Sequence, residues 1–94
     1  MFVYILTNEQ NSVLYIGVTN NIKRRLAEHK SEAISGFTKQ YKTKKLVYLK
    51  EYSSPIEAIK REKQLKGWTR IKKQQLISKE NPNWTDMSEQ YQFK

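Results

Sequence analysis

The stretch YIGVTNNIKRRLAEHK, residues 15–30, runs from a strand-like start into a short amphipathic helix. Four side chains fall at the i, i+3, i+4 and i+7 spacing of a helical stripe that faces a core, namely Ile22, Arg25, Leu26 and His29. Two of the four are apolar, whereas the other two are an arginine and the chain's single histidine. The spacing therefore predicts that two ionisable side chains point inward.

The segment before this helix has the pattern of a β-hairpin. Two β-branched and aromatic runs, FVYIL (2–6) and VLYIGV (13–18), flank a polar connection. An even-length loop, such as one from Asn8 to Asn11, places Tyr4 and Tyr15 directly opposite each other, and an odd-length loop places them on opposite faces. The sequence leaves this register open. A glycine inside the second strand, Gly17, indicates a bulge or a close approach to the backbone.

The remaining elements follow from local signals. Asn20 or Asn21 can cap the helix that ends near Lys30. Residues 31–45 are predicted to form an irregular basic excursion, and LVYLKEY (46–52) is predicted to be a third strand.

Two further helices are predicted after this strand. In SPIE (54–57), Ser54 at the N-cap and Glu57 at N3 form the pattern of a capping box, with proline at N1. That helix is expected to end near Lys66, and another is expected from about Arg70 to Lys79. The order is ββαβαα, an α/β fold of the α+β kind in which helices flank a small, three-stranded, mainly antiparallel sheet. We expect one domain over residues 1–84 and a loose C-terminal tail over 85–94.

Composition narrows the classes of function. With 94 residues and no cysteine, the chain is expected to be one domain without disulfides or thiolate metal sites. No apolar run reaches the length of a membrane span and no signal peptide is evident, so we expect a soluble cytoplasmic protein without a membrane partner. Lys plus Arg number 18 against 9 acidic residues, a net charge of +9. This excess favours nucleic acid as a partner, the alternative being a generally soluble surface.

A carboxylate interrupts the apolar side of the second predicted helix. Glu62 lies near the middle of the half-helix that is defined by Ile56, Ala58, Ile59 and Leu65, although Lys63 and Lys66 fall in the same arc. A carboxylate among apolar neighbours needs a partner or a metal. Arg25, His29 and Glu62 therefore have a reason to converge. The structural alternative is an Arg25–Glu62 ion pair beside a hydrogen-bonded, partly buried histidine.

Four segments in this order resemble the GIY-YIG nuclease domain: VYI (3–5), YIG (15–17), RRLAEH (24–29) and REKQLKGW (61–68). The likeness extends from residue 2 to residue 84 and is greatest to small stand-alone bacterial members related to an excinuclease subunit. Phe2-Val3 replaces the Gly-Ile of the first motif, while the tyrosine is retained.

The resemblance implies a site and a reaction. The implied catalytic residues are Tyr4, Tyr15, Arg25, His29, Glu62 and Asn81, with Gly17 structural within its motif and Glu62 binding Mg²⁺ or Mn²⁺. Spacing near Asn81 varies in the family. The implied reaction is hydrolysis of DNA phosphodiester bonds, with repair or recombination as the expected setting and branched or damaged DNA among the expected substrates.

These roles agree with the chemistry of the side chains. A magnesium ion on Glu62 can polarise a phosphate and stabilise the leaving oxygen. Arg25 suits the negative charge that develops on the phosphoryl oxygens. His29 and one of the tyrosines can move a proton away from the attacking water. Which tyrosine acts as the base is left open.

The basic excursion offers a separate nucleic-acid contact. Its lysines are Lys39, Lys42, Lys44 and Lys45, and Phe37 and Tyr41 lie between them. They can contact the DNA backbone or stack on bases, the alternative being a solvated loop.

Two other functions remain open. The chain can be a non-cleaving nucleic-acid-binding module of the same fold, whose affinity is mostly electrostatic. It can also be an interaction domain recruited by a protein partner, with Trp68 and Trp84 as anchors if they are exposed rather than in the core. A partner for targeting is plausible because no separate DNA-binding domain fits into this length. The sequence predicts no oligomeric state.

Overall fold

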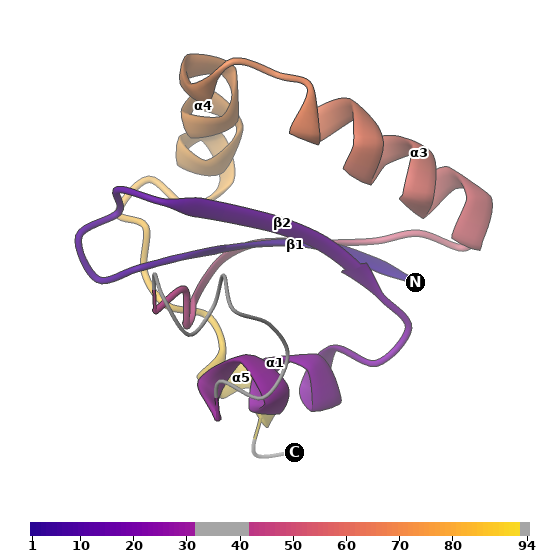
Figure 1. Cartoon of the computed structure of the whole chain (residues 1–94), viewed down its shortest axis with the longest axis horizontal. Helices are drawn as coiled ribbons and strands as arrows, with labels where there is room; N and C mark the ends of the chain where they lie inside the picture. Colours follow the sequence, from indigo (N-terminus) through magenta and orange to yellow (C-terminus); the bar gives the residue numbers. More distant parts are fainter. Residues whose placement is uncertain (32–41, 93–94) are drawn as a thin grey trace.

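The fold is a three-stranded antiparallel sheet with helices on both faces (Figure 1). The computed structural model of the chain describes residues 1–31 and 42–92. Strand β1 (Phe2–Thr7) is central and pairs with β2 (Leu14–Thr19) on one side and β3 (Lys45–Glu51) on the other. The predicted hairpin and third strand are therefore confirmed.

The hairpin register brings the two tyrosines onto one face. Tyr4 pairs with Gly17 and Leu6 pairs with Tyr15, so the connection spans residues 8–13. This even-length loop places the tyrosines on the same face but two residues apart in register, rather than directly opposite each other. The longer connection is stabilised by Asn8, whose side chain accepts hydrogen bonds from the backbone N–H groups of Ser12 and Val13.

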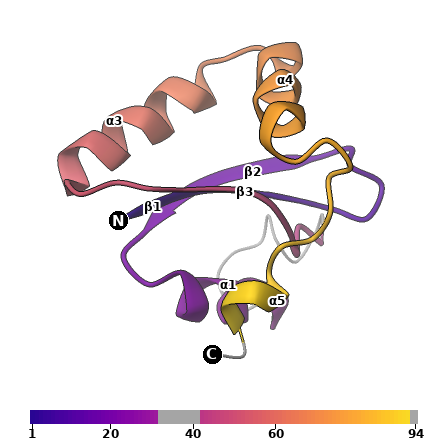
Figure 2. The same cartoon turned by 180° about the vertical axis from the view of Figure 1, so that it is seen from behind.

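The helices form a layer on each face of the sheet. Helix α1 (Ile22–Lys30) and the short α5 (Glu89–Gln92) cover one face, while α3 (Pro55–Lys66) and α4 (Arg70–Glu80) cover the other (Figures 1 and 2). The order ββαβαα is thus confirmed, with α5 following it. Within residues 1–31 and 42–92, no helix is long and apolar enough to cross a bilayer.

Helices α1 and α3 begin in different ways. Asn21 caps α1, because its side-chain oxygen accepts a hydrogen bond from the backbone N–H of Arg24 at 3.0 Å. Ser54 occupies the N-cap of α3, but its side chain forms no capping hydrogen bond. The predicted N-cap position is therefore confirmed, but the hydrogen bond that a capping box requires from the Ser54 side chain is absent. Pro55 at N1 presets the backbone of the first turn instead.

Each face of the sheet has its own apolar core. On the α1 face, Leu26 packs with sheet residues that include Tyr4, Leu6 and Leu46. The larger cluster on the other face contains Val3, Ile5, Ile16, Val47, Tyr48, Ala58, Leu65 and Ile77. Both tryptophans are half-buried against this second cluster, which agrees with a core role for them.

The buried face of α3 is narrower than predicted. Ala58 and Leu65 are fully buried, but Ile56 and Ile59 are 67% and 40% exposed. The prediction that both isoleucines belong to the apolar half is wrong, because the helix contacts the sheet along the stripe through Ala58 and Leu65. Glu62 lies between these two on the same stripe, at i+4 and i−3.

The C-terminal segment is anchored rather than loose. Asp86 accepts a hydrogen bond from the backbone N–H of Leu46 at 3.0 Å, and the backbone N–H of Met87 donates to the Leu46 carbonyl at 2.8 Å. Lys30 lies 3.7 Å from the Asp86 carboxylate. The prediction of a free tail missed these bonds, because they join residues 40 apart in sequence and leave no local pattern.

Candidate active site

Three of the predicted site residues form a ring cluster on the α1 face of the sheet. The Tyr4 hydroxyl lies 3.3 Å from His29 Nε2. The ring centroids of Tyr15 and His29 are 4.9 Å apart in an edge-on arrangement, and those of Tyr4 and Tyr15 are 6.3 Å apart. The hairpin and α1 thus bring Tyr4, Tyr15 and His29 together, as the inward stripe of the helix predicts.

Gly17 makes room for the first tyrosine. A Cβ atom at this position would overlap the hydroxyl and Cζ of Tyr4. Its backbone φ angle is not positive, so conformational freedom is not the reason for a glycine here. The prediction of a close approach is confirmed: the absent side chain lets the Tyr4 ring lie over the neighbouring strand.

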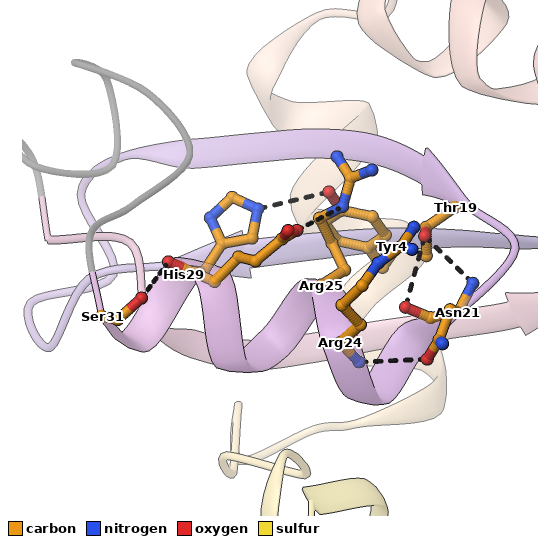
Figure 3. Close-up of polar contacts among 8 residues, drawn as sticks. Tyr4, Thr19, Asn21, Arg24, Arg25, His29 and Ser31 are labelled. Atoms are coloured by element: carbon orange, nitrogen blue, oxygen red, sulfur yellow. Dashed lines mark hydrogen bonds and ion pairs between the residues drawn. The ribbon is translucent and has the colours of Figure 1, made fainter.

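Arg25 lies beside this cluster, one turn before His29 (Figure 3). Its Nε lies 3.4 Å from Glu28 Oε1 and forms no aligned hydrogen bond with the described residues. The side chain is 28% exposed, so the guanidinium is partly accessible. A buried donor without a well-aligned partner is uncommon in folded proteins, and one explanation for it is a binding site whose ligand is not present.

The environment sets the protonation of the pair formed by Tyr4 and His29. Burial, followed by the positive charge of Arg25, lowers the pKa of His29 to about 4. Burial, followed by the neighbouring Tyr15, raises the pKa of Tyr4, although Arg25 opposes this rise by its charge and a hydrogen bond. At neutral pH the imidazole is therefore uncharged and the phenol protonated. Which of the two groups donates in the Tyr4–His29 hydrogen bond depends on the imidazole tautomer, because each group can donate or accept.

Accessibility divides the cluster into an inner and an outer part. Tyr4 and His29 are fully buried, whereas Tyr15 and Arg25 are partly exposed. A substrate can therefore reach the outer pair directly. The inner pair can act only through it, by hydrogen bonding and proton transfer.

Glu62 belongs to α3, on the other face of the sheet. Its Oε2 lies 3.0 Å from Lys66 Nζ one turn along the helix, and its side chain is 14% exposed. Lys66 also lines a groove of about 260 Å³ along the edge of β2, together with Tyr15 and Lys73. Glu62 itself is not among the residues that line this groove, and no direct contact joins Glu62 to Arg25 or His29 among the described residues. The alternative Arg25–Glu62 ion pair does not form, since each pairs within its own helix.

Asn81 lies apart from the ring cluster, and its side chain forms hydrogen bonds with backbone groups. It is buried after α4, where its side-chain amide donates to the carbonyls of Val47 and Thr85 at 3.2 and 2.9 Å. Its side-chain oxygen accepts from the backbone N–H of Thr85 at 3.1 Å. These bonds hold the end of α4 to β3 and account for the burial of the asparagine without a part in chemistry.

The predicted basic segment is described only in part. Lys39, Phe37 and Tyr41 lie outside the described residues. Lys42 is exposed, while Lys44 and Lys45 are half-buried at the start of β3. Their part in nucleic-acid contact stays a prediction.

Two residues near the cluster were missed by the sequence analysis. Glu28 partners Arg25 at i+3, and Lys66 partners Glu62 at i+4. Both spacings are those of neighbours on a helix surface, so the signal was present in the sequence. Lys73 carries no such signal, because its position in the groove depends on how α4 packs beside β2.

The described residues contain no group of three or more His, Cys, Asp or Glu side chains arranged to hold a metal ion. A fully protein-made metal cage is therefore not built in the part of the chain that the structure covers. The single carboxylate of Glu62, whose side chain is 14% exposed, fits a magnesium ion that takes its other ligands from water and substrate phosphate.

Comparison with known proteins identifies the family and the fold of the chain. Residues 1–75 match the GIY-YIG catalytic domain. The chain is 43% identical over 82 residues to a UPF0213 protein of Syntrophus aciditrophicus, which covers 86% of this chain and 92% of that protein. It is 37% identical over 76 residues to a UPF0213 protein of Staphylococcus haemolyticus, covering 81% and 92%. The solution NMR structure of a UPF0213 protein from Bacillus halodurans superposes with a TM-score of 0.59 at 28% identity, covering 97% of this chain and 96% of that one.

Proposed function

Since this chain belongs to the GIY-YIG catalytic domain family, we propose that it is a metal-dependent endonuclease that hydrolyses DNA phosphodiester bonds. The observation that carries the proposal is the contact between a buried tyrosine, a neutral histidine and a second tyrosine, with a partly exposed arginine beside them. A purely structural cluster of this kind would not need a partly exposed arginine whose Nε has no aligned hydrogen-bond partner among the described residues.

In the proposed reaction the outer pair meets the substrate. The Arg25 guanidinium binds a non-bridging phosphoryl oxygen and stabilises the charge that develops there. Tyr15 contacts the attacking water, because it is the more accessible of the two tyrosines. The proton leaves toward His29, whose lowered pKa keeps the imidazole neutral and able to accept. In the proposed tautomer His29 Nε2–H donates to the Tyr4 hydroxyl oxygen, so Tyr4 holds the imidazole in place and Nδ1 is the nitrogen that accepts the proton.

Glu62 is the proposed ligand for Mg²⁺ or Mn²⁺. A divalent cation bound there would supply Lewis-acid stabilisation of the phosphate and of the leaving oxygen. Lys66, which is 55% exposed, can move from the carboxylate to a substrate phosphate when the cation binds. The net charge of +9 favours DNA as the substrate by long-range attraction.

Nicking of supercoiled plasmid and of branched DNA, with Mg²⁺, Mn²⁺ or EDTA, tests the proposal. Arg25→Ala is expected to lower the nicking rate by about 10²-fold or more, the usual effect of removing one transition-state donor. Arg24→Ala is the matched control, because the neighbouring arginine is exposed and only its backbone N–H is used, at the cap.

The metal requirement is tested in the same assay. Glu62→Gln is expected to abolish metal-dependent nicking, while Glu57→Gln, an exposed carboxylate on the same helix, retains it. Nicking that survives both Arg25→Ala and Glu62→Gln would contradict the proposed site. Salt-sensitive DNA binding without nicking under any metal condition would instead support a binding module of the same fold.

A further inference from the structure

A β-bulge in β3 turns part of that strand toward the α3 and α4 face. Ile5 pairs with Tyr48 and Leu6 pairs with Leu46, so Val47 is the extra residue on β3. Without the bulge, alternation would send Tyr48 to the same face as Leu46, on the α1 side. With it, Tyr48 and the two alternate residues after it, Lys50 and Tyr52, line the opposite side. Bulges that re-aim side chains are common next to functional sites.

These re-aimed side chains line one of two adjoining hollows on the α3 and α4 face. The first, of about 450 Å³, is lined by Tyr48, Lys50, Tyr52 and Arg61 among others. The second, of about 360 Å³, is lined by Trp68 and Lys72 among others. Leu76 and Lys79 line both, so the hollows are neighbours, and we call the two together the β3 groove. The catalytic cluster lies on the other face of the sheet (Figure 2).

The β3 groove combines aromatic rings with positive charge. Arg61 and Lys72 lie over the Trp68 ring, at 4.9 and 5.6 Å from its centroid. The lining includes four cationic side chains, Lys50, Arg61, Lys72 and Lys79, and one acidic side chain, Glu80. None of the four cations forms an ion pair within 4.0 Å that is recorded among the described residues. An excess of unneutralised cations beside aromatic rings matches the backbone and bases of a nucleic acid.

We infer that the β3 groove is a second nucleic-acid site, which binds a single-stranded segment. Each hollow has the volume of a small-molecule pocket, large enough to receive a base. Aromatic side chains can stack only on bases that are free of their own neighbours, and this condition is met in a single strand and not within a duplex. An acidic peptide would satisfy the lysines but leave the aromatic rings unused.

This inference does not depend on cleavage. A nuclease that holds duplex DNA on the α1 face and a single strand on the β3 face is suited to DNA in which both forms meet, such as a flap or a fork. If the chain does not cleave DNA, the β3 groove still predicts binding of a single strand.

Tryptophan fluorescence tests the groove directly, because Trp68 is in it and Trp84 is elsewhere, with its Nε1 donating to Ser78. In a Trp84→Phe variant, titration with a short oligo(dT) is expected to quench Trp68. A duplex of the same length and a polyglutamate peptide are expected to quench it much less. In Trp68→Phe, where Trp84 is the remaining fluorophore, little quenching is expected. If Trp84→Phe folds poorly, the quenching of the unchanged protein is compared with that of Trp68→Phe instead.

Charge variants locate the binding. Lys72→Gln with Lys79→Gln, both exposed in the groove, is expected to weaken oligo(dT) binding about tenfold and to lower the salt slope by about 1.4, which is two phosphate contacts at about 0.7 each. Lys60→Gln with Lys63→Gln removes the same charge from exposed positions on α3 that line neither hollow and is expected to change binding much less.

Two outcomes would overturn the inference. One is equal quenching by duplex, single strand or peptide, and the other is an equal loss of binding in the two lysine pairs. Arg25→Ala distinguishes the sites, since it is expected to abolish nicking and to leave quenching by oligo(dT) unchanged. Loss of quenching in Arg25→Ala would place the single strand on the α1 face instead.

Discussion

Helices α1 and α3 lie on opposite faces of the same sheet, and each directs charged residues toward it. On α1 the charged residues join a connected cluster, in which His29 contacts two tyrosines and Arg25 lies at the mouth. On α3, the ion pair found for the Glu62 carboxylate among the described residues is with Lys66 of its own helix. The α1 arrangement therefore joins two strands and a helix, whereas the α3 arrangement stays within one helix.

The difference between the α1 cluster and the α3 carboxylate follows from how easily each kind of side chain can be buried. Rings and a neutral imidazole are held by packing, because burying them requires no counter-charge. Burial among the same groups would disfavour the charge of a carboxylate, and Glu62 keeps part of its side chain, 14%, exposed on α3. Substitutions of the buried α1 groups are therefore expected to change protein stability as well as activity, whereas substitution of Glu62 is expected to act mainly on the proposed metal site.

The largest effect is expected from the protonation of His29. Its pKa is about 4 in the folded chain and about 6.5 when unfolded, so the unfolded chain binds more protons between these values. The free energy of unfolding is therefore expected to fall as the pH drops from 6.5 to 4, by about 3 kcal/mol at most. Urea denaturation at a series of pH values measures how steeply the free energy of unfolding changes with pH.

A His29→Gln variant provides the control for this slope. Whatever the stability of this variant at neutral pH, its free energy of unfolding is expected to change little between pH 6.5 and 5. Carboxyl groups contribute little to the pH dependence in this range. Asp86, whose pKa is lowered by hydrogen bonds despite its burial, contributes only at lower pH, where its carboxylate becomes protonated. An unchanged slope in the variant would mean that the histidine is charged in the folded protein.

Two glycines, one in strand β2 and one at the end of α3, have different roles, and Gly17→Ala is expected to have the next largest effect. The added methyl group overlaps the Tyr4 phenol, which has no free space to move into because it is fully buried. We expect a loss of about 1–3 kcal/mol, typical of overpacking, together with a loss of nicking as the ring is displaced.

Gly67→Ala is the matched control at the end of α3. There the new Cβ meets only the Gln64 carbonyl, at 3.5 Å, and the Lys63 carbonyl, at 3.8 Å, which are ordinary contacts. Its φ of −83° suits alanine, so stability is expected to change by less than about 1 kcal/mol, in the stabilising direction. Equal destabilisation by both substitutions would contradict the special role of Gly17.

The sequence predicted the α1 side better than the α3 side, for a physical reason. The hairpin, the Asn21 cap and the inward stripe are local patterns, and together they determine that Arg25 and His29 face the tyrosines. The direction of Glu62 could be read from helical periodicity, but which face of the sheet α3 covers could not. The prediction for Ile56 and Ile59 was wrong because periodicity indicates which side of the helix faces the sheet. It does not indicate how wide a strip of the helix surface the sheet covers.

Long-range bonds account for the remaining differences. The bulge at Val47 has no signal in LVYLKEY, yet it determines the face on which Tyr48 lies. The carbonyl of Val47 is bound by Asn81, and the backbone of Leu46 is bound by Asp86 and Met87. These partners are far along the chain, so neither the bulge nor the anchored C-terminal segment could be predicted from a local pattern.

The smallest expected effect compares the first turns of α1 and α3. Asn21→Ala removes an acceptor for the Arg24 N–H and is expected to lower the free energy of unfolding by about 1 kcal/mol, the usual value for a capping side chain. Ser54→Ala removes a side chain without a capping bond and is expected to change it by less than about 0.5 kcal/mol, within the range of surface substitutions. Urea denaturation of both variants at one pH measures the difference. Equal losses would mean that Ser54 caps α3 in solution, and the start of that helix would then depend on its side chain as well as on Pro55.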